Sequence, residues 1–337
     1  MKKRTRARLV WLCLLCALLL TACQPMPPVE TPPAVPTAMP IATPTSGESR
    51  YVVGVAWQGM TPYVQRLEAQ LLGFAKQLPF DIEFIMMDGS ENYEKQISQV
   101  ENFISHKVDL ILLNPCSYEK LTPAVTAANN AGIPIITMIT RVQNQRECLS
   151  FVGSDHKESA ILEGTLAAES LQGQGSIVIL EGTIGIEAQL ERRKGYAEIL
   201  ALYPGLSVAA IQPAFWEKDE GYMIVENLIH NGIAIDAVLS QNDNMALGAL
   251  EAVEAAEMQE RILVFGIDGD SAAIEAVEQG RLAGTVYMDA YHQAKQISEC
   301  IQMVRDGQTP EKEYFIPFVV LNKDTIHQSS VQELLVR

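Results

Sequence analysis

Residues with side chains suited to holding a small polar molecule follow several predicted strands of this sequence. They are Tyr63, Asn114, Thr140 and Arg141 in the first half of the chain, and Trp216, Asn242 and Asp268 in the second. Aromatic rings can cover the C–H faces of a sugar-like ring, and amide, carboxylate and guanidinium groups can hydrogen-bond with its hydroxyls. The chemistry that these residues predict is reversible binding of a polyhydroxylated molecule.

Each of these residues also has a purely structural interpretation. Asn114 and Asn242 are of a type that caps helices, and Trp216 is an ordinary core residue by type. Asp268 with Gly269 is typical of a turn. Their occurrence at equivalent strand ends in both halves of the chain favours a binding site.

Sequence motifs for covalent or metal chemistry are absent. The sequence has no GxSxG, no HExxH, no phosphate-binding glycine loop and no CxxC paired with a second metal motif. Cys116 follows a predicted strand and His156 stands 40 residues further on, but no motif links them. We therefore predict no catalytic residue, no metal site and no cofactor.

Short apolar runs alternate with helical patterns from Tyr51 onward. The predicted strands are Tyr51–Val55, Ile82–Met86, Leu110–Leu113, Ile133–Ile136, Ile177–Leu180, Val208–Ile211, the run between Asp236 and Asn242, and Ile262–Asp268. Continuous apolar strands separated by amphipathic helices predict parallel sheets covered on both faces.

The order of elements repeats within the chain. Gly195-Tyr196 follows Gly73-Phe74 at an offset of 122, and Asp236 to Asn242 follows Asp109 to Asn114 at offsets of 127 and 128. Two similar α/β lobes explain this near-constant spacing. Since ligands bind at the carboxyl ends of parallel strands, two facing sheets predict a cleft between the lobes.

The chain is acidic. Its 337 residues include 25 Lys and Arg against 41 Asp and Glu, a net charge of −16, which becomes −21 without the five basic residues at positions 2–8. Such a body repels phosphate backbones and anionic lipid headgroups. Nucleic acid is therefore excluded as a partner, and contact with a membrane is expected only through an anchor.

The N-terminal segment is expected to export and anchor the protein. Basic residues precede an apolar run of twelve residues, Leu9–Leu20, which is too short to span a bilayer comfortably. Leu20-Thr21-Ala22-Cys23 resembles the lipobox of bacterial lipoproteins, which implies lipidation of Cys23. The alternative is an ordinary signal peptide with a chance cysteine. Residues 24–49 are rich in proline, which predicts an extended tether between the anchor and the folded body.

Three cysteines remain after this segment: Cys116, Cys148 and Cys300. An exported protein permits oxidation, and Cys116 and Cys148 follow neighbouring predicted strands of the first lobe. A Cys116–Cys148 disulfide and three buried thiols are both open at this point.

The body of the sequence resembles the type I periplasmic binding proteins, in particular the ribose/galactose branch of sugar receptors. The resemblance covers nearly all of residues 51–322. It rests on Gln241–Leu250 (QNDNMALGAL), Asn114-Pro115, Gly132-Ile133-Pro134, Phe265–Gly269 and Leu282–Val286. The fold it implies is two doubly wound parallel-sheet lobes joined by a three-crossing hinge.

The resemblance also implies where the hinge crosses. The crossings are expected near Ser154-Asp155, Met288-Asp289 and Pro317-Phe318. The resulting division is a signal peptide at 1–22, a lipidated Cys23 and tether at 23–50, an N-terminal lobe of 51–154 plus 289–317, and a C-terminal lobe of 155–288 plus 318–337.

Carried over position by position, the resemblance implies a ligand pocket that departs from the ribose type. Its residues are Tyr63, Asn114, Thr140, Arg141, Trp216, Asn242, Asp268 and Met288. Thr61, Thr140, Leu190 and Met288 stand where the family usually has Asn, a carboxylate, Arg and Gln, while Arg192 matches a more structural arginine. Each sugar hydroxyl left unpaired costs about 1–3 kcal/mol. A deoxy sugar, a glycoside or another small polar molecule is therefore expected instead of ribose.

The function implied is that of an extracytoplasmic, lipid-anchored and monomeric receptor that delivers a small sugar-like ligand to an ABC transporter permease. Presentation of the ligand to a chemoreceptor or sensor kinase is the alternative. Regulators of the lactose-repressor kind share the core but need a DNA-reading helix-turn-helix before it, where this chain has its signal and tether.

Overall fold

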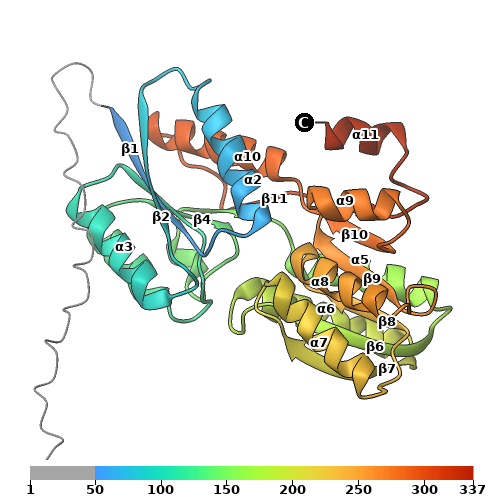
Figure 1. Cartoon of the computed structure of the whole chain (residues 1–337). Helices are drawn as coiled ribbons and strands as arrows, with labels where there is room; N and C mark the ends of the chain where they lie inside the picture. The colour runs from blue at the N-terminus through green and yellow to red at the C-terminus, as the bar shows by residue number, and fades with distance from the viewer. Residues whose placement is uncertain (1–49, 337) are drawn as a thin grey trace, which may run out of the picture. The chain divides into compact units, whose positions relative to one another are not determined.

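The computed structural model describes residues 50–336, and within them two six-stranded sheets organise the chain (Figure 1). The predicted signal peptide, Cys23 and tether lie outside the described residues. In the described part, none of the helices combines the length and the apolar character needed to cross a membrane.

The first sheet has the strand order β11-β5-β4-β3-β1-β2, with all neighbours parallel. Its strands are β1 (Tyr51–Trp57), β2 (Ile82–Asp88), β3 (Leu110–Leu113), β4 (Ile135–Ile139), β5 (Ser150–Gly153) and β11 (Glu313–Phe315). Its helices are α2 (Pro62–Ala75), α3 (Tyr93–Ser105), α4 (Thr122–Asn130) and α10 (Ala290–Arg305), with a short 3-10 turn, η1, at Gln145–Glu147.

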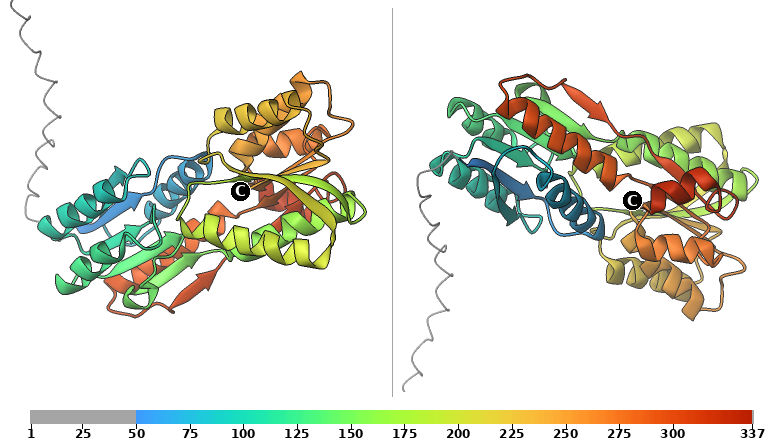
Figure 2. Two further views of the ribbon diagram at one scale, coloured as in Figure 1. Left: turned by 90° about the horizontal axis from the view of Figure 1, so that it is seen from below. Right: turned by 90° about the horizontal axis from the view of Figure 1, so that it is seen from above.

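Alternate residues of β1 pack into two separate hydrophobic cores, one on each face of the first sheet. Val53, Val55 and Trp57 pack with α2 and α10, whereas Ala56 packs with α3 and α4 on the other face. Figure 1 and the right-hand view of Figure 2 show α10 beside α2, although the two helices are more than 200 residues apart in sequence. This sheet is therefore buried on both faces, which explains why its strands read as continuous apolar runs.

The second sheet repeats the plan in the order β12-β10-β9-β8-β6-β7. Its strands are β6 (Gln174–Glu181), β7 (Gly205–Pro213), β8 (Ala237–Ser240), β9 (Leu263–Asp268), β10 (Gly284–Tyr287) and β12 (Val319–Leu321). Its helices are α5 (His156–Ser170), α6 (Glu187–Leu202), α7 (Lys218–His230), α8 (Asp243–Ala255), α9 (Ser271–Glu278) and α11 (Ser329–Leu335).

Helices also cover both faces of the second sheet. Val178, Leu180 and Val238 pack with α7, α8 and α9, and Ile177 and Ile179 pack with α5 and α6. Figure 2 shows these two groups of helices on opposite sides of the strands. Only β12 runs antiparallel to its neighbour, β10.

The chain passes between the two sheets three times. It leaves the first sheet after β5 and enters α5, returns after β10 into α10, and crosses again from β11 to β12. The fold class predicted from the sequence, two doubly wound lobes with three crossings, is confirmed.

Most predicted strands are present with shifted ends. Leu110–Leu113 matches β3, whereas the strand expected at 133–136 begins two residues later, at Ile135. Pro134 cannot donate a backbone hydrogen bond, and in the structure its carbonyl accepts from the backbone of Ile111 just before β4 begins. The strands β5, β11 and β12 were not predicted.

The described cysteines are free thiols. Cys116, Cys148 and Cys300 are all buried, and Cys116 and Cys148 share the core on the α3 and α4 face of the first sheet. Of the two possibilities left open by the sequence, the structure has the buried thiols and not the Cys116–Cys148 disulfide.

Candidate functional site

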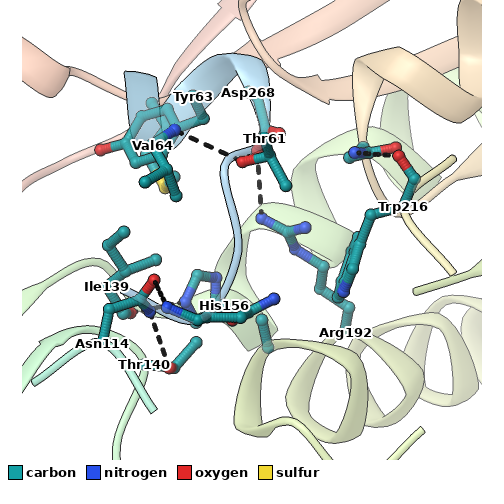
Figure 3. A pocket seen from close by; sticks show the side chains of 14 residues that line it. Thr61, Tyr63, Val64, Asn114, Ile139, Thr140, His156, Arg192, Trp216 and Asp268 are labelled. Carbon is teal, nitrogen blue, oxygen red and sulfur yellow. Dashed lines mark hydrogen bonds and ion pairs between the residues drawn. The ribbon is translucent and has the colours of Figure 1, made fainter. Parts of the chain in front are cut away.

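A pocket lies where strand ends of the two lobes face each other (Figure 3). Its lining residues are Gln58, Thr61, Tyr63, Val64, Asn114, Ile139, Thr140, His156, Ala188, Arg192, Trp216, Asn242, Asp268 and Met288. They enclose about 400 Å³, open solvent included. Small-molecule sites occur preferentially where two domains or lobes meet.

All predicted site residues except Arg141 line this pocket. They come from the ends of β3, β4, β8, β9 and β10, from the start of α2, and from the loop between β7 and α7. The parallel sheets bring these side chains together because the carboxyl ends of their strands share one edge. Whether each of them touches a ligand remains a prediction.

Arg141 is placed outside the pocket, contrary to its predicted position. The chain turns sharply after β4: Ile139 has a φ of 65°, and the backbone N–H of Thr140 donates to the carbonyl of Met138 at 2.7 Å. The Arg141 guanidinium donates to Glu187 at 2.9 Å and stacks on Phe151 and Phe315. Arg141 therefore bridges the lobes beside the pocket.

The guanidinium group that lines the pocket belongs to Arg192 and not to Arg141. Its Nη2 lies 3.6 Å from Oδ1 of Asp268, and its Nε donates to the hydroxyl of Ser159 at 3.2 Å. Its Nη1 donates to the carbonyl of Gln241. Both charged side chains are buried, so the cation and the anion compensate each other inside the pocket.

Burial sets the protonation of Asp268. It raises the pKa of this carboxyl to about 7, while the neighbouring Arg192 acts to lower it. The backbone of Asp268 has a φ of 120°, outside the common regions for a non-glycine residue. Such conformations cluster at functional sites.

The two aromatic residues are held in different ways. The hydroxyl of Tyr63 donates to the side chain of Gln293, so its polar end is occupied within the first lobe. The carbonyl of Trp216 accepts from Asn244 at 2.8 Å, and its ring packs against Gly182, where a Cβ would come within 2.0 Å of it. The indole Nε1 of Trp216 is buried without a hydrogen-bond partner in the described chain.

The two strand-end asparagines have structural partners as well as pocket positions. Asn242 caps α8 by accepting from the backbone of Met245 at 2.9 Å, as its structural interpretation predicted. Asn114 does not cap a helix; its side chain accepts from the backbone N–H of Gln58 at 3.2 Å. Asn114 thereby ties the ends of β1 and β3 together at the pocket.

Polar contacts also join the lobes around the pocket. Arg66 of α2 donates to the carbonyls of Asp268 and Gly269 at 2.9 and 2.6 Å and pairs with Asp270 at 2.9 Å. On another side, the backbone N–H of Tyr118 donates to the carbonyl of Gly185 at 2.8 Å. These contacts require the present approach of the lobes.

Sequence reasoning missed several lining residues. His156 and Arg192 were noticed but not assigned to the pocket, and Val64, Ile139 and Ala188 were not singled out. His156 follows the first crossing directly, and Arg192 is the one buried arginine of α6, so the crossing and the helix face were the available signals.

Two α/β lobes joined by three crossings, with a pocket between their strand ends, are the architecture of the type I periplasmic binding proteins. The chain belongs to this family: residues 52–309 match the family model described as a periplasmic binding protein domain. The family consists of solute receptors, which confirms the prediction that the chain is not an enzyme.

Relatives and solved structures agree with this assignment. The chain is 29% identical to the ribose import binding protein of Bacillus subtilis, over 89% of this chain and 93% of that protein. It is 32% identical to a xylitol-binding protein of Mycolicibacterium smegmatis, over 69% of this chain and 66% of that protein. A solute binding protein of an ABC transporter from Bacillus halodurans, solved with bound myo-inositol, has a TM-score of 0.80 and 32% identity, covering 86% of this chain and 98% of that one.

Proposed function

We propose that the protein captures a neutral, polyhydroxylated small molecule between its lobes and delivers it to an ABC transporter permease. The observation that carries this proposal is the pocket itself, in which aromatic faces and buried polar groups from both lobes converge. Its one carboxylate, Asp268, faces its one guanidinium, Arg192, so a neutral ligand suits it better than an ion.

The ligand class is narrowed by the apolar part of the lining. Val64, Ile139, Ala188 and Met288 offer no side-chain group that pairs well with a hydroxyl. This supports a ligand with an unsubstituted or less hydroxylated side. The similar proteins are named for, or solved with, ribose, xylitol and myo-inositol, and these define the first compounds to test.

A thermal-shift screen of D-ribose, xylitol and myo-inositol tests the proposed function, with further sugars and polyols behind them. A ligand that binds only the folded protein raises its Tm by mass action, by an amount that grows with concentration. We expect at least one compound of this class to do so and calorimetry to give saturable binding. If no sugar or polyol binds to protein that is shown to be folded, the proposal is rejected.

We also propose that the chain is exported and anchored through its N-terminus. Residues 1–22 act as the signal peptide, Cys23 carries the lipid, and the segment up to residue 50 is the tether. Cys23→Ala should release the protein from membranes or block its processing. Membrane fractionation equal to that of wild type would contradict the anchor.

The proposed moving bodies are the lobes assigned from the sequence, 51–154 with 289–317 and 155–288 with 318–337. Their limits fall within the three crossings between the sheets. Ligand contacts on both lobes favour the closed arrangement, and closure around the ligand is a hinge motion. The protein acts as a monomer that the permease recognises in its closed form.

A further inference from the structure

His156 is the first residue of α5, immediately after the first crossing between the sheets, and it lines the pocket. Its side chain is 1% exposed. Its Nε2 lies 2.7 Å from the backbone carbonyl of Ile139. A carbonyl oxygen only accepts hydrogen bonds, so Nε2 carries a proton and donates.

The surroundings of His156 keep the ring neutral. Burial lowers the pKa of His156 well below its usual value, and the nearby guanidinium groups of Arg192 and Arg141 lower it further against a smaller opposing effect of the Ile139 carbonyl. Glu187 of α6, the facing carboxyl, lies 4.0 Å from Nε2. With Nε2 protonated and the ring neutral, Nδ1 presents a lone pair.

That lone pair has no partner in the described chain. Nδ1 of His156 is buried without a hydrogen bond, as is the indole N–H of Trp216 on the same pocket. Figure 3 shows both rings at the border of this pocket. Unpaired buried polar atoms are rare and unfavourable, so a site that holds one acceptor and one donor in this state is prepared for a ligand that carries both.

We propose that His156 is a specificity-determining residue whose Nδ1 accepts a hydrogen bond from one hydroxyl of the ligand. The pocket then requires a donor at this position of the ligand and rejects analogues in which that hydroxyl is removed or methylated. This inference rests on the proposed function, since it presupposes a polyhydroxylated ligand in the pocket.

Nitrogen NMR of the histidine side chains tests the hydrogen bond directly, with whichever of D-ribose, xylitol and myo-inositol gives the largest thermal shift. Without the sugar or polyol, His156 should show a protonated Nε2 and a bare Nδ1. On saturation, the Nδ1 resonance should move in the direction of a hydrogen-bonded nitrogen while Nε2 keeps its proton. His106 and His230, which lie outside the pocket, are internal controls.

Binding of monodeoxy analogues provides the second measurement. On wild-type protein, one analogue should bind about tenfold more weakly, or worse, than the parent compound, because the site leaves its acceptor unpaired. On His156→Phe, which has no acceptor, parent and analogue should bind within about twofold of each other. A variant that does not fold leaves the NMR test of the wild type in place.

The outcomes separate the two proposals. A bound sugar or polyol with an unmoved Nδ1 resonance, or a ring protonated on Nδ1, overturns the role of His156 and leaves the proposed function standing. If the deoxy analogue loses the same factor of affinity, relative to the parent compound, on wild type and on His156→Phe, the role of His156 is likewise overturned and the proposed function stands. If none of the three compounds and none of the wider class binds, the proposed function fails and this inference fails with it.

Discussion

We propose that ligand recognition in this pocket depends on two charged residues, Asp268 and Arg192. Above the raised pKa of Asp268, about 7, its carboxylate balances the charge of the Arg192 guanidinium, and both groups keep hydrogen-bonding capacity toward a hydroxyl. Hydrogen bonds to charged groups are stronger than those between neutral groups, so these two residues should provide most of the polar binding energy.

Asp268→Asn tests this role with little change of shape. Asn has nearly the shape of Asp and meets the same backbone conformation as the native residue, but its amide no longer balances the charge of Arg192. We expect ligand binding to weaken by about 2 kcal/mol, the usual scale for hydrogen bonds to a charged group. Calorimetry measures the effect, and Asp219→Asn, at an exposed position of α7, is the control. Unchanged affinity in Asp268→Asn would place the ligand elsewhere.

The cysteine thiols should be unreactive in the folded protein and free after unfolding. Burial raises the pKa of Cys116 and Cys148 to about 12 each, which suppresses the reactive thiolate. Iodoacetamide should therefore modify neither in the native state, and should modify both after denaturation without reductant. Peptide mass mapping reads out the result. A peptide pair linked through Cys116 and Cys148 would show that the disulfide forms.

At the scale of elements, the strand pattern and the internal repeat predicted two α/β lobes and most of the strand-end positions of the pocket, and the family resemblance added the three crossings and Met288. A residue just past a buried parallel strand has a defined place, which is why Asn114, Asn242 and Asp268 were located correctly. Arg141 was misplaced because the left-handed turn at Ile139, which redirects the chain, has no signature in a β-branched residue.

Four of the pocket residues that sequence reasoning did not assign, Val64, His156, Ala188 and Arg192, lie on helices. Arg192 is one of two adjacent arginines of α6, and only the tertiary structure decides that it is buried while Arg193 is exposed. His156 depends on the angle at which α5 leaves the crossing. Helical periodicity indicates which residues share a face, but not which face of α5 or α6 meets the cleft.

The turn after β6 should fix the position of Trp216. A Cβ on Gly182 would lie 2.0 Å from the indole ring, so Gly182→Ala forces the ring or the backbone to move. We expect a loss of stability of about 1–3 kcal/mol, weaker ligand binding and a change in tryptophan emission. Thermal unfolding, calorimetry and fluorescence give the three readouts.

Gly73→Ala in α2 is the matched control for Gly182→Ala. A Cβ at this exposed helical position meets nothing within 4 Å. Because alanine favours a helix over glycine by up to about 1 kcal/mol, Gly73→Ala should stabilise the protein slightly without affecting the ligand. If Gly182→Ala behaves like this control, the packing of Trp216 on Gly182 is not what positions the ring.

For the whole molecule, the contacts between the lobes make the approach of the two sheets sensitive to charge. The ion pair of Arg141 with Glu187 crosses the cleft on one side, and Arg66 crosses it on the other. Burial raises the pKa of Glu187 to about 7 against the opposing effect of Arg141. The unfolded carboxyl titrates near pH 4.3, so the folded protein binds an additional proton between these values.

This difference predicts a pH-dependent contribution of Glu187 to stability. Because the folded pKa is the higher one, the contribution is complete below the unfolded pKa and is lost as pH rises through about 7. The Tm of unliganded wild type minus that of Glu187→Gln should therefore fall between pH 5 and pH 8, by the equivalent of roughly 1–3 kcal/mol. Thermal unfolding at several pH values measures the difference.

Arg141→Gln gives the second arm of this pH experiment. Arg141 lowers the pKa of Glu187, so Arg141→Gln should raise that pKa. In the Arg141→Gln background, the contribution of Glu187 to the Tm should therefore be lost at higher pH. A difference between wild type and Glu187→Gln that does not vary with pH would contradict a buried, proton-binding Glu187. A difference that rises with pH would show that the carboxyl is ionised and stabilised by Arg141 throughout.

In the proposed function, closure around the ligand is the step by which the permease recognises the occupied receptor. A ligand favours the closed form only by its additional contacts in that form. Tyr63 and Asn114 lie on one side of the pocket, and Asp268 and Trp216 lie on the other. Saturating ligand should therefore lower the radius of gyration measured by small-angle scattering, and should quench or shift the emission of Trp216.

Two variants separate closure from simple binding. Trp216→Phe should remove most of the fluorescence change but keep the compaction, and the residual change reports Trp57. Arg66→Met removes the contacts with Asp268, Gly269 and Asp270, which exist only when the lobes approach, so it should weaken affinity and reduce compaction together. An unchanged radius of gyration in wild type, with binding established by calorimetry, would mean that the lobes do not close and that a permease cannot distinguish the occupied receptor by its shape.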